Sequence, residues 1–253
     1  MQMFLDGLIL KDKFHLILSK TDSDYFMNVD DFKIMNSQNG TLVGVKIDNR
    51  MSFDGHVSKL CKKASQKLHA LSRISSFMNF NQRKIIMKSF INSQFGYCPL
   101  VWIFHSRKLN NRINKIHERA LRIVFKNMNL SFRELLDKDN SVTIHEKNIQ
   151  SLAVEMYKQS NEISPKIMNE VFPLKKEIKY HSKTEFETRN VKTEMYGIES
   201  LAHLGPKIWA ILPKKLKEIT SLNIFQQEIK IWKQTKSHCK LCKTNKKGFG
   251  NID

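Results

Sequence analysis

The sequence predicts a mainly α-helical protein with a small β unit at its N-terminus. After residue 50, apolar residues recur at three- and four-residue steps over long stretches, which is the spacing of amphipathic helices. The first fifty residues instead hold short apolar segments separated by Asp, Ser, Asn and Gly clusters, which is typical of strands and turns. We divide the chain into a β unit at 1–50, a basic helical region at 51–174 and a C-terminal extension at 175–253.

The β unit contains three strand-like segments, at 14–18, 25–29 and 41–47. Each is rich in apolar and aromatic residues and is bounded by turn-forming residues. Two or three such strands bury little apolar surface, which argues against independent folding of this unit.

Three helices are predicted in the basic region. The first runs from about Phe53 to Met78, where Asp54 can cap its start, and the third runs from about Arg107 to Phe125. The second can open at Asn81 and should kink or end at Pro99, because proline lacks the donor N–H and clashes with the preceding turn. Each helix has an apolar stripe, and Lys and Arg occupy other faces.

Charge is concentrated in these helices. The whole chain has 43 Lys and Arg against 24 Asp and Glu, a formal net charge of +19, and residues 51–128 hold fifteen against two. Such a block is typical of a surface that binds a phosphate backbone, although a merely solvated face could use the same residues. The candidate contacts are Lys59, Lys62, Lys63, Lys67, Arg73, Arg107, Lys108, Arg112, Lys115, Arg119 and Arg122.

Further helix starts follow. A hydroxyl residue with Glu three positions later forms a capping-box pattern at Ser131 and again at Thr143. Ser164-Pro165 and Gly205-Pro206 each place a proline where a helix can begin. Residues 184–193 alternate in a way that favours an extended pair or a loop, and residues 221–232 form a last amphipathic helix.

Several motifs, in order along the chain, carry a resemblance to a known family. They are LVGVKIDNRMSF at 42–53, VSKLCKKA at 57–64, SQFGYCPLVW at 93–102, NRINKIHERALR at 111–122, LGPKIW at 204–209, Trp232 and CKLC at 239–242. Together they resemble the end of the reverse transcriptase, an RNA-directed DNA polymerase, of non-LTR, jockey-like retrotransposons, over nearly the whole chain. The resemblance implies palm-end strands at 1–50, then a helical thumb-like bundle and a mixed C-terminal extension.

The resemblance also implies a partner, a primer–template duplex of RNA and DNA that is bound without sequence preference. Gly44 matches a segment that lies close to the primer end in the family, where a residue without Cβ lets backbone approach nucleic acid. An ordinary core strand with a glycine bend explains Gly44 equally well. Tyr97 and Trp102 lie in an apolar run, so packing between helices is favoured over stacking on bases.

Catalysis in this family needs two Mg²⁺ ions held by palm carboxylates, and those aspartates lie upstream of the segment that Met1 opens. We therefore expect no catalytic residue, no cofactor and no polymerase activity in this chain alone. Asp30-Asp31 lies too close to Gly44 to match the catalytic pair, and a polar turn is the favoured interpretation. The alternatives are a basic helical interaction or structural protein with no nucleic-acid role, and a non-functional truncated product.

The four cysteines do not form a disulfide framework. Cys239 and Cys242 have the gap of half a zinc site, but a structural site needs four ligands, so free thiols are favoured. Cys61 and Cys98 are interpreted as small core residues. No apolar run approaches the ~18 residues of a membrane span, and the N-terminus is a poor signal peptide. These features predict an intracellular protein, in the nucleus or the cytoplasm.

Overall fold

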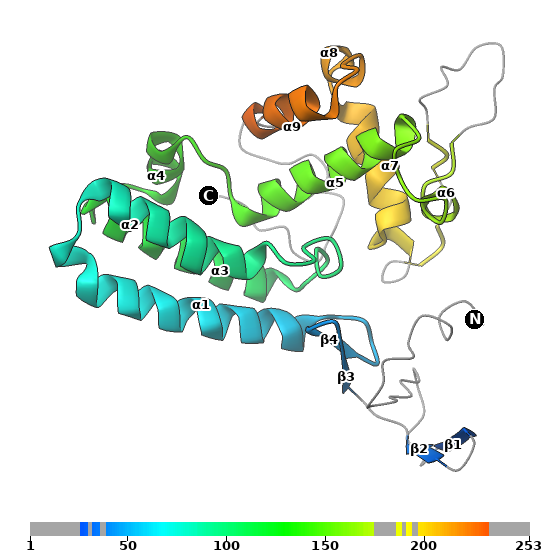
Figure 1. Ribbon diagram of the computed structural model, residues 1–253, viewed down its shortest axis with the longest axis horizontal. Helices are drawn as coiled ribbons and strands as arrows, with labels where there is room; N and C mark the ends of the chain where they lie inside the picture. The colour runs from blue at the N-terminus through cyan, green and yellow to red at the C-terminus, as the bar shows by residue number, and fades with distance from the viewer. Residues whose placement is uncertain are drawn as a thin grey trace.

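The computed structural model describes residues 26–29, 32–35, 39–174, 186–188, 191–193 and 197–232, and these residues are mainly helical with a small β part at the N-terminal end (Figure 1). The predicted strand at 14–18 lies outside the described residues. So do the Asp30-Asp31 pair and the Cys239 and Cys242 thiols.

The β part consists of two antiparallel hairpins. Strand β1 (Phe26–Val29) pairs with β2 (Phe32–Met35), and β3 (Asn39–Leu42) pairs with β4 (Val45–Asp48). The prediction of one strand over 41–47 is wrong, because the chain turns at Val43 and Gly44, which have φ of 47° and 79°. Positive φ at both residues of a two-residue turn matches the right-handed twist of the strands it joins. Glycine adopts this conformation freely, whereas a β-branched valine does so rarely.

A layer of three helical segments follows. Helix α1 (Asp54–Ile74) is succeeded by a 3-10 turn, η2 (Ser75–Phe77), and then by α2 (Phe80–Ile86), the π-helical turn η3 (Met87–Ile91) and the 3-10 turn η4 (Asn92–Phe95). Helix α3 (Arg107–Phe125) completes the layer. The chain runs out along α1, back along α2 to η4, and out again along α3, so α1 and α3 are parallel (Figure 1).

The first and third predicted helices are confirmed within a few residues. The second begins one residue before the predicted Asn81, because Asn79 caps it. The Gln82 N–H donates to Asn79 Oδ1 at 2.9 Å, and the Asn79 N–H donates to Gln82 Oε1 at 3.0 Å. The helical segment ends at Phe95, before Pro99 is reached.

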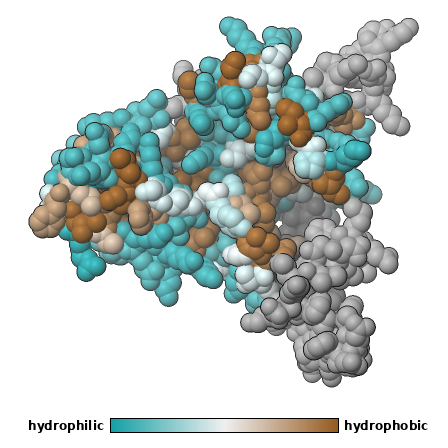
Figure 2. Space-filling view, viewed as in Figure 1, coloured by the Kyte–Doolittle hydropathy of each residue, from teal (hydrophilic) through white to brown (hydrophobic). Residues whose placement is uncertain are grey.

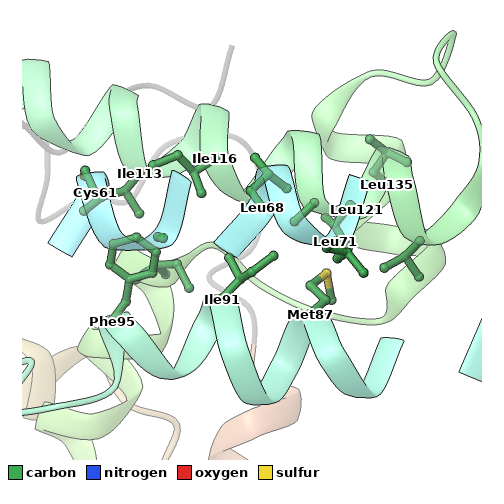
Figure 3. Packing of buried hydrophobic residues seen from close by; sticks show 14 of the residues in the cluster. Cys61, Leu68, Leu71, Met87, Ile91, Phe95, Ile113, Ile116, Leu121 and Leu135 are labelled. Atoms are coloured by element: carbon green, nitrogen blue, oxygen red, sulfur yellow. The ribbon is translucent and has the colours of Figure 1, made fainter. Parts of the chain in front are cut away.

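Apolar residues of these helices meet in what we call the first core. Figure 3 shows side chains of α1, of the α2–η4 segment and of α3 pointing toward one another, joined by Leu135 of α4 (Phe132–Asp139). The buried members include Val57, Cys61, Ala64, Leu68, Leu71, Met87, Ile91, Phe95, Trp102, Ile113, Ala120, Leu121, Val124, Leu135 and Ile144. Burial raises the pKa of the Cys61 thiol to about 11, which agrees with a structural cysteine. Cys98 is different: it lies half-buried in a turn with φ of 44°, so its interpretation as a small core residue is wrong.

The second core lies around α5 (Ile144–Ser160), α7 (Leu201–Ile211) and α9 (Leu222–Ile231), with the short α6 (Met168–Val171) and α8 (Lys214–Lys217) at its margins. Aromatic residues fill much of it. Tyr157 stacks on Phe225 with ring centroids 4.2 Å apart, and its hydroxyl donates to the carbonyl of Ile219 at 2.8 Å. Phe186 meets Trp209 edge-on at 5.7 Å. This core draws residues from both sides of residue 174.

After residue 130, four predicted helix N-termini can be compared with the structure. The capping boxes at Ser131 and Thr143 are confirmed, and in each the Glu three residues later accepts the N–H of the cap residue. The start predicted at Ser164-Pro165 is wrong, since α6 begins at Met168 and the Ser164 hydroxyl makes no hydrogen bond among the described residues.

The start predicted at Gly205-Pro206 is also wrong, because α7 begins four residues earlier at Leu201. Gly205 instead allows a close approach of helices. A Cβ placed there would lie 2.6 Å from Met156 Sδ and 2.7 Å from Phe172 Cε1. The last helix, predicted over 221–232, is confirmed as α9.

Candidate nucleic-acid interface

Four of the predicted contact residues form one stripe along α3. Lys108, Arg112, Lys115 and Arg119 follow one another at steps of four, three and four residues, and all four are exposed. At 3.6 residues per turn they lie within about 60° of one another around the helix axis. The stripe flanks the buried residues Leu109 and Ile116, so packing of the first core fixes the direction in which it faces.

The stripe borders an open groove between α3 and α1. The groove has a volume of about 610 Å³, and its walls include Asp54, Ser58, Ser106, Lys108, Asn111, Arg112 and Lys115. Among the described residues, no acidic side chain lies within 4 Å of the ammonium or guanidinium groups of the stripe. The groove is therefore positively charged along its α3 side.

The one carboxylate in the groove wall holds the two helices in register. Asp54 Oδ1 accepts a hydrogen bond from the backbone N–H of Ser106 at 3.1 Å, so the first turn of α1 is tied to the residue before α3. The N-termini of two parallel helices thus lie side by side. Each terminus carries a partial positive charge from its aligned peptide dipoles, which adds to the charge of the stripe.

A second carboxylate fixes the turn that leads into α1. Asp48 accepts hydrogen bonds from the N–H of Phe53 at 2.7 Å and from the N–H and hydroxyl of Ser52, both at 3.1 Å. Burial alone would raise the pKa of this carboxyl, but the hydrogen bonds outweigh it and the pKa is lowered. The ionised Asp48 thereby sets the angle between β4 and α1.

The basic residues of α1 do not form a matching stripe. Lys62 follows Ser58 by four residues and so shares the side of α1 that faces the groove. Lys59 and Lys63 are exposed on the outer side of the helix. Arg73 is exposed too and points within about 20° of Lys62, but it lies about 16 Å further along the helix and does not line the groove. Lys67 faces the opposite flank, where its ammonium lies 5.6 Å from the centre of the Phe90 ring. The predicted α1 contacts are therefore spread around the exposed arc.

Two of the predicted residues on α3 also lie off the stripe. Arg107 precedes Lys108 by one residue and so points about 100° away from it. Arg122 is paired, because its Nη2 lies 2.7 Å from Glu118 Oε1 and also donates to the carbonyl of Leu130 at 3.4 Å. Its charge is partly neutralised by Glu118, and its side chain is half-buried rather than fully exposed.

The polar residues of the groove are not among the contacts predicted from the sequence. Ser58 and Asn111 line it, and their signal is positional: each lies one helical turn from a basic residue of the interface, Lys62 and Lys115. Arg83 is not among the predicted contacts either, and its role is structural. It is buried, and it donates to the carbonyl of Val124 at 3.0 Å, which joins α2 to the end of α3.

Gly44 lies at the tip of the β3–β4 hairpin, against Tyr97. The Tyr97 hydroxyl donates to the carbonyl of Val43 at 2.8 Å, and a Cβ on Gly44 would lie 4.0 Å from the ring. Tyr97 is 49% exposed, so the expectation that it packs between helices is wrong. The same expectation for Trp102 is confirmed, because Trp102 is fully buried and its indole N–H donates to the carbonyl of Tyr97 at 3.1 Å.

Apolar residues gather at the far end of the first core. Figure 2 shows hydrophobic side chains at the end of the molecule where α1 turns back into α2, beside a largely hydrophilic surface. Phe77 is 89% exposed there, and Ile74 and Phe80, three residues before it and three residues after it, are exposed as well. We call these three residues the apolar tip.

Within the described part of the chain, no three His, Cys, Asp or Glu side chains are grouped so as to hold a metal ion. No described helix has both the length and the apolar character needed to cross a membrane. A scan against protein-family models finds no match, and searches of curated proteins and of solved structures find none either.

Proposed function

We propose that this chain binds the backbone of an RNA/DNA primer–template duplex without sequence preference, as the palm end, thumb and C-terminal tail of a non-LTR, jockey-like reverse transcriptase. The observation that supports binding is the stripe of Lys108, Arg112, Lys115 and Arg119 beside the groove, four cations with no acidic partner among the described residues. The ordered motifs from residue 42 to residue 242 support the choice of family.

The dimensions of the stripe suit a nucleic-acid backbone. From Lys108 to Arg119 the helix rises about 16 Å, while duplex DNA presents a phosphate about every 3.4 Å along each strand. Lysine and arginine contacts to phosphate position a duplex but carry no sequence information. The chain would therefore hold a duplex in place without recognising its base sequence.

The test compares two triple charge reversals with the same change in net charge. In the first, Lys108→Glu, Arg112→Glu and Arg119→Glu replace three of the four cations of the stripe. In the second, Lys59→Glu, Lys63→Glu and Arg73→Glu change three cations of α1 that do not line the groove. Binding of a labelled RNA/DNA hybrid, measured by fluorescence anisotropy over a salt series, should fall about a hundredfold or more in the first variant.

For the first variant, the slope of log affinity against log salt should become shallower by about two to three, because three phosphate contacts are lost. The second variant should lose about tenfold or less, through long-range charge alone. Equal losses in both variants, or an affinity independent of salt, would contradict the proposed interface. The unmodified chain should synthesise no DNA on a primed RNA template. Synthesis would overturn the proposal that this chain alone is inactive.

A second candidate is a helical interaction protein with no nucleic-acid role, and the apolar tip favours it. Phe77 is 89% exposed and belongs to an apolar patch (Figure 2), and exposed apolar patches are typical of surfaces that another protein covers. Phe77→Ser separates the two candidates. It should leave hybrid binding unchanged if the stripe is the functional surface, whereas loss of self-association or of protein binding alone, measured by sedimentation, would favour the second candidate.

A further inference from the structure

A second polar site lies between the two cores. It is a cleft of about 710 Å³. One wall comes from η3, η4, α3 and the end of α4, and the other comes from α5 and α9. The volume is within the range of small-molecule sites, which is about 300–1,000 Å³.

The charge in this cleft is positive. Lys88 on η3, Lys147 on α5 and Lys230 on α9 line it, and none has an acidic partner within 4 Å among the described residues. Two carboxylates also line it, but both are neutralised. Asp139 lies 2.6 Å from Lys84 Nζ, and Glu155 lies 2.8 Å from Lys158 Nζ.

Three residues of the cleft wall carry buried polar atoms that lack a hydrogen-bond partner among the described residues. These are Nδ1 and Nε2 of His117, Oδ1 of Asn92 and Oγ of Ser141. His117 is only 2% exposed, and its ring meets Phe132 edge-on, with ring centroids 5.7 Å apart. Leaving a buried polar group without a partner costs free energy, so three such residues around one cleft indicate that a bound molecule satisfies them.

The protonation state of His117 suits this role. Burial lowers its pKa to about 4, outweighing the attraction of the Asp139 carboxylate. Its imidazole is therefore neutral near pH 7, with one nitrogen able to donate and the other able to accept a hydrogen bond. The neutral ring of His117, the amide of Asn92 and the hydroxyl of Ser141 can together form hydrogen bonds with an uncharged polar group.

We propose that the cleft binds a small phosphorylated organic molecule. The phosphate would lie among Lys88, Lys147 and Lys230, because three unpaired ammonium groups can share its charge. The polar groups in the rest of the molecule would form hydrogen bonds with Asn92, His117 and Ser141. This site does not depend on the proposed nucleic-acid interface, since none of these six residues lines the α1–α3 groove.

Calorimetric titration of the whole chain tests the site with two phosphate esters of different origin, glucose 6-phosphate and AMP. Inorganic phosphate, glucose and adenosine serve as the partial probes. At least one ester should bind about tenfold more tightly than inorganic phosphate, and neither unphosphorylated compound should bind comparably. Whichever ester binds identifies the sugar-phosphate or the nucleotide class. If neither ester binds more tightly than inorganic phosphate, the proposal is wrong.

Variants place the binding in the cleft. Lys147→Glu with Lys230→Glu should weaken the ester about tenfold or more, and Ser141→Ala about threefold. Two controls should change it less than about twofold: Lys59→Glu with Lys63→Glu, which has the same charge change, and the triple variant of the stripe. Equal weakening by the cleft pair and the matched control pair would reduce the effect to general charge and overturn the site. Duplex binding that fails while ester binding persists would count against the proposed function only.

Discussion

The two cores of this chain are built in different ways. The first core joins long helices whose buried residues recur every three or four positions, so each helix brings a ready-made apolar stripe. The second core brings together shorter helices with segments between them, and its centre depends on aromatic contacts between residues far apart in the chain, such as Tyr157 with Phe225. A core made of local repeats can be predicted from sequence, whereas one made of distant contacts cannot.

The two cores also exchange residues. Ile103, next to Trp102 of the first core, packs in the second core, and Ile144, the first residue of α5, packs in the first. These crossings give each core an apolar contact that belongs to the other. We therefore expect the cores to unfold together, although they are built differently.

The largest effect should come from matched core truncations. Leu121→Ala in the first core and Leu152→Ala in the second each remove a fully buried side chain, so each should lower the free energy of unfolding by about 2–5 kcal/mol. Hydrogen exchange, followed separately in peptides of α1 and of α9, should show faster exchange in both regions for either variant. Faster exchange confined to the mutated core would show that the two cores are independent units.

Acid should weaken the junction between the cores. The pKa of His117 is about 4 in the folded chain against about 6.5 when unfolded, so the unfolded state binds more protons between these values. Stability is therefore full above pH 6.5 and falls as the pH drops toward 4, by about 3 kcal/mol at most from this residue. Burial lowers the pKa values of His105 and His145 in the same direction.

Denaturant unfolding of His117→Gln at a series of pH values checks this. Between pH 6.5 and 4, the free energy of unfolding should decrease less in this variant than in the unmodified chain. The matched control, His69→Gln, replaces an exposed histidine of α1 and should retain the whole decline. Identical pH profiles for His117→Gln and the unmodified chain would contradict the assignment.

The smallest effect concerns the caps of the helices on either side of the junction. Ser131→Ala removes the capping box of α4 in the first core, and Thr143→Ala removes that of α5, whose residues fill the second. Each should cost about 1 kcal/mol. Thr143 is buried whereas Ser131 is exposed, so the loss at Thr143 should be the larger of the two in thermal unfolding. A larger loss at Ser131 would reverse this order.

Predictions from the sequence were most accurate where structure is local. The extents of α1 and α3, the two capping boxes and the last helix follow from spacing and side-chain chemistry within a few residues. Predictions were wrong where a distant contact decides the outcome. Gly205 was assigned to a helix start because of its neighbour Pro206, whereas its place inside α7 reflects the approach of Met156 and Phe172 from other elements.

The candidate interface divides in the same way. The α3 stripe could be predicted, because its four cations recur with the helical period. Glu118 and Arg122 are only four residues apart, so their pairing is also local. The structure was needed to show that this pair reduces the positive charge of Arg122 at the surface. The cleft could not be predicted, since it joins residues of η3, η4, α3, α4, α5 and α9 that have no common sequence pattern.

The parallel arrangement of α1 and α3 has a consequence for the order of folding. Two consecutive antiparallel helices can pair as soon as the turn between them forms, but α1 and α3 meet at Asp54 and Ser106, which are 52 positions apart. Closing so long a loop costs chain entropy before any contact is gained. We therefore expect α1 to pair early with the α2–η4 segment and α3 to dock late. The basic stripe would then reach its final position only in the last stage of assembly.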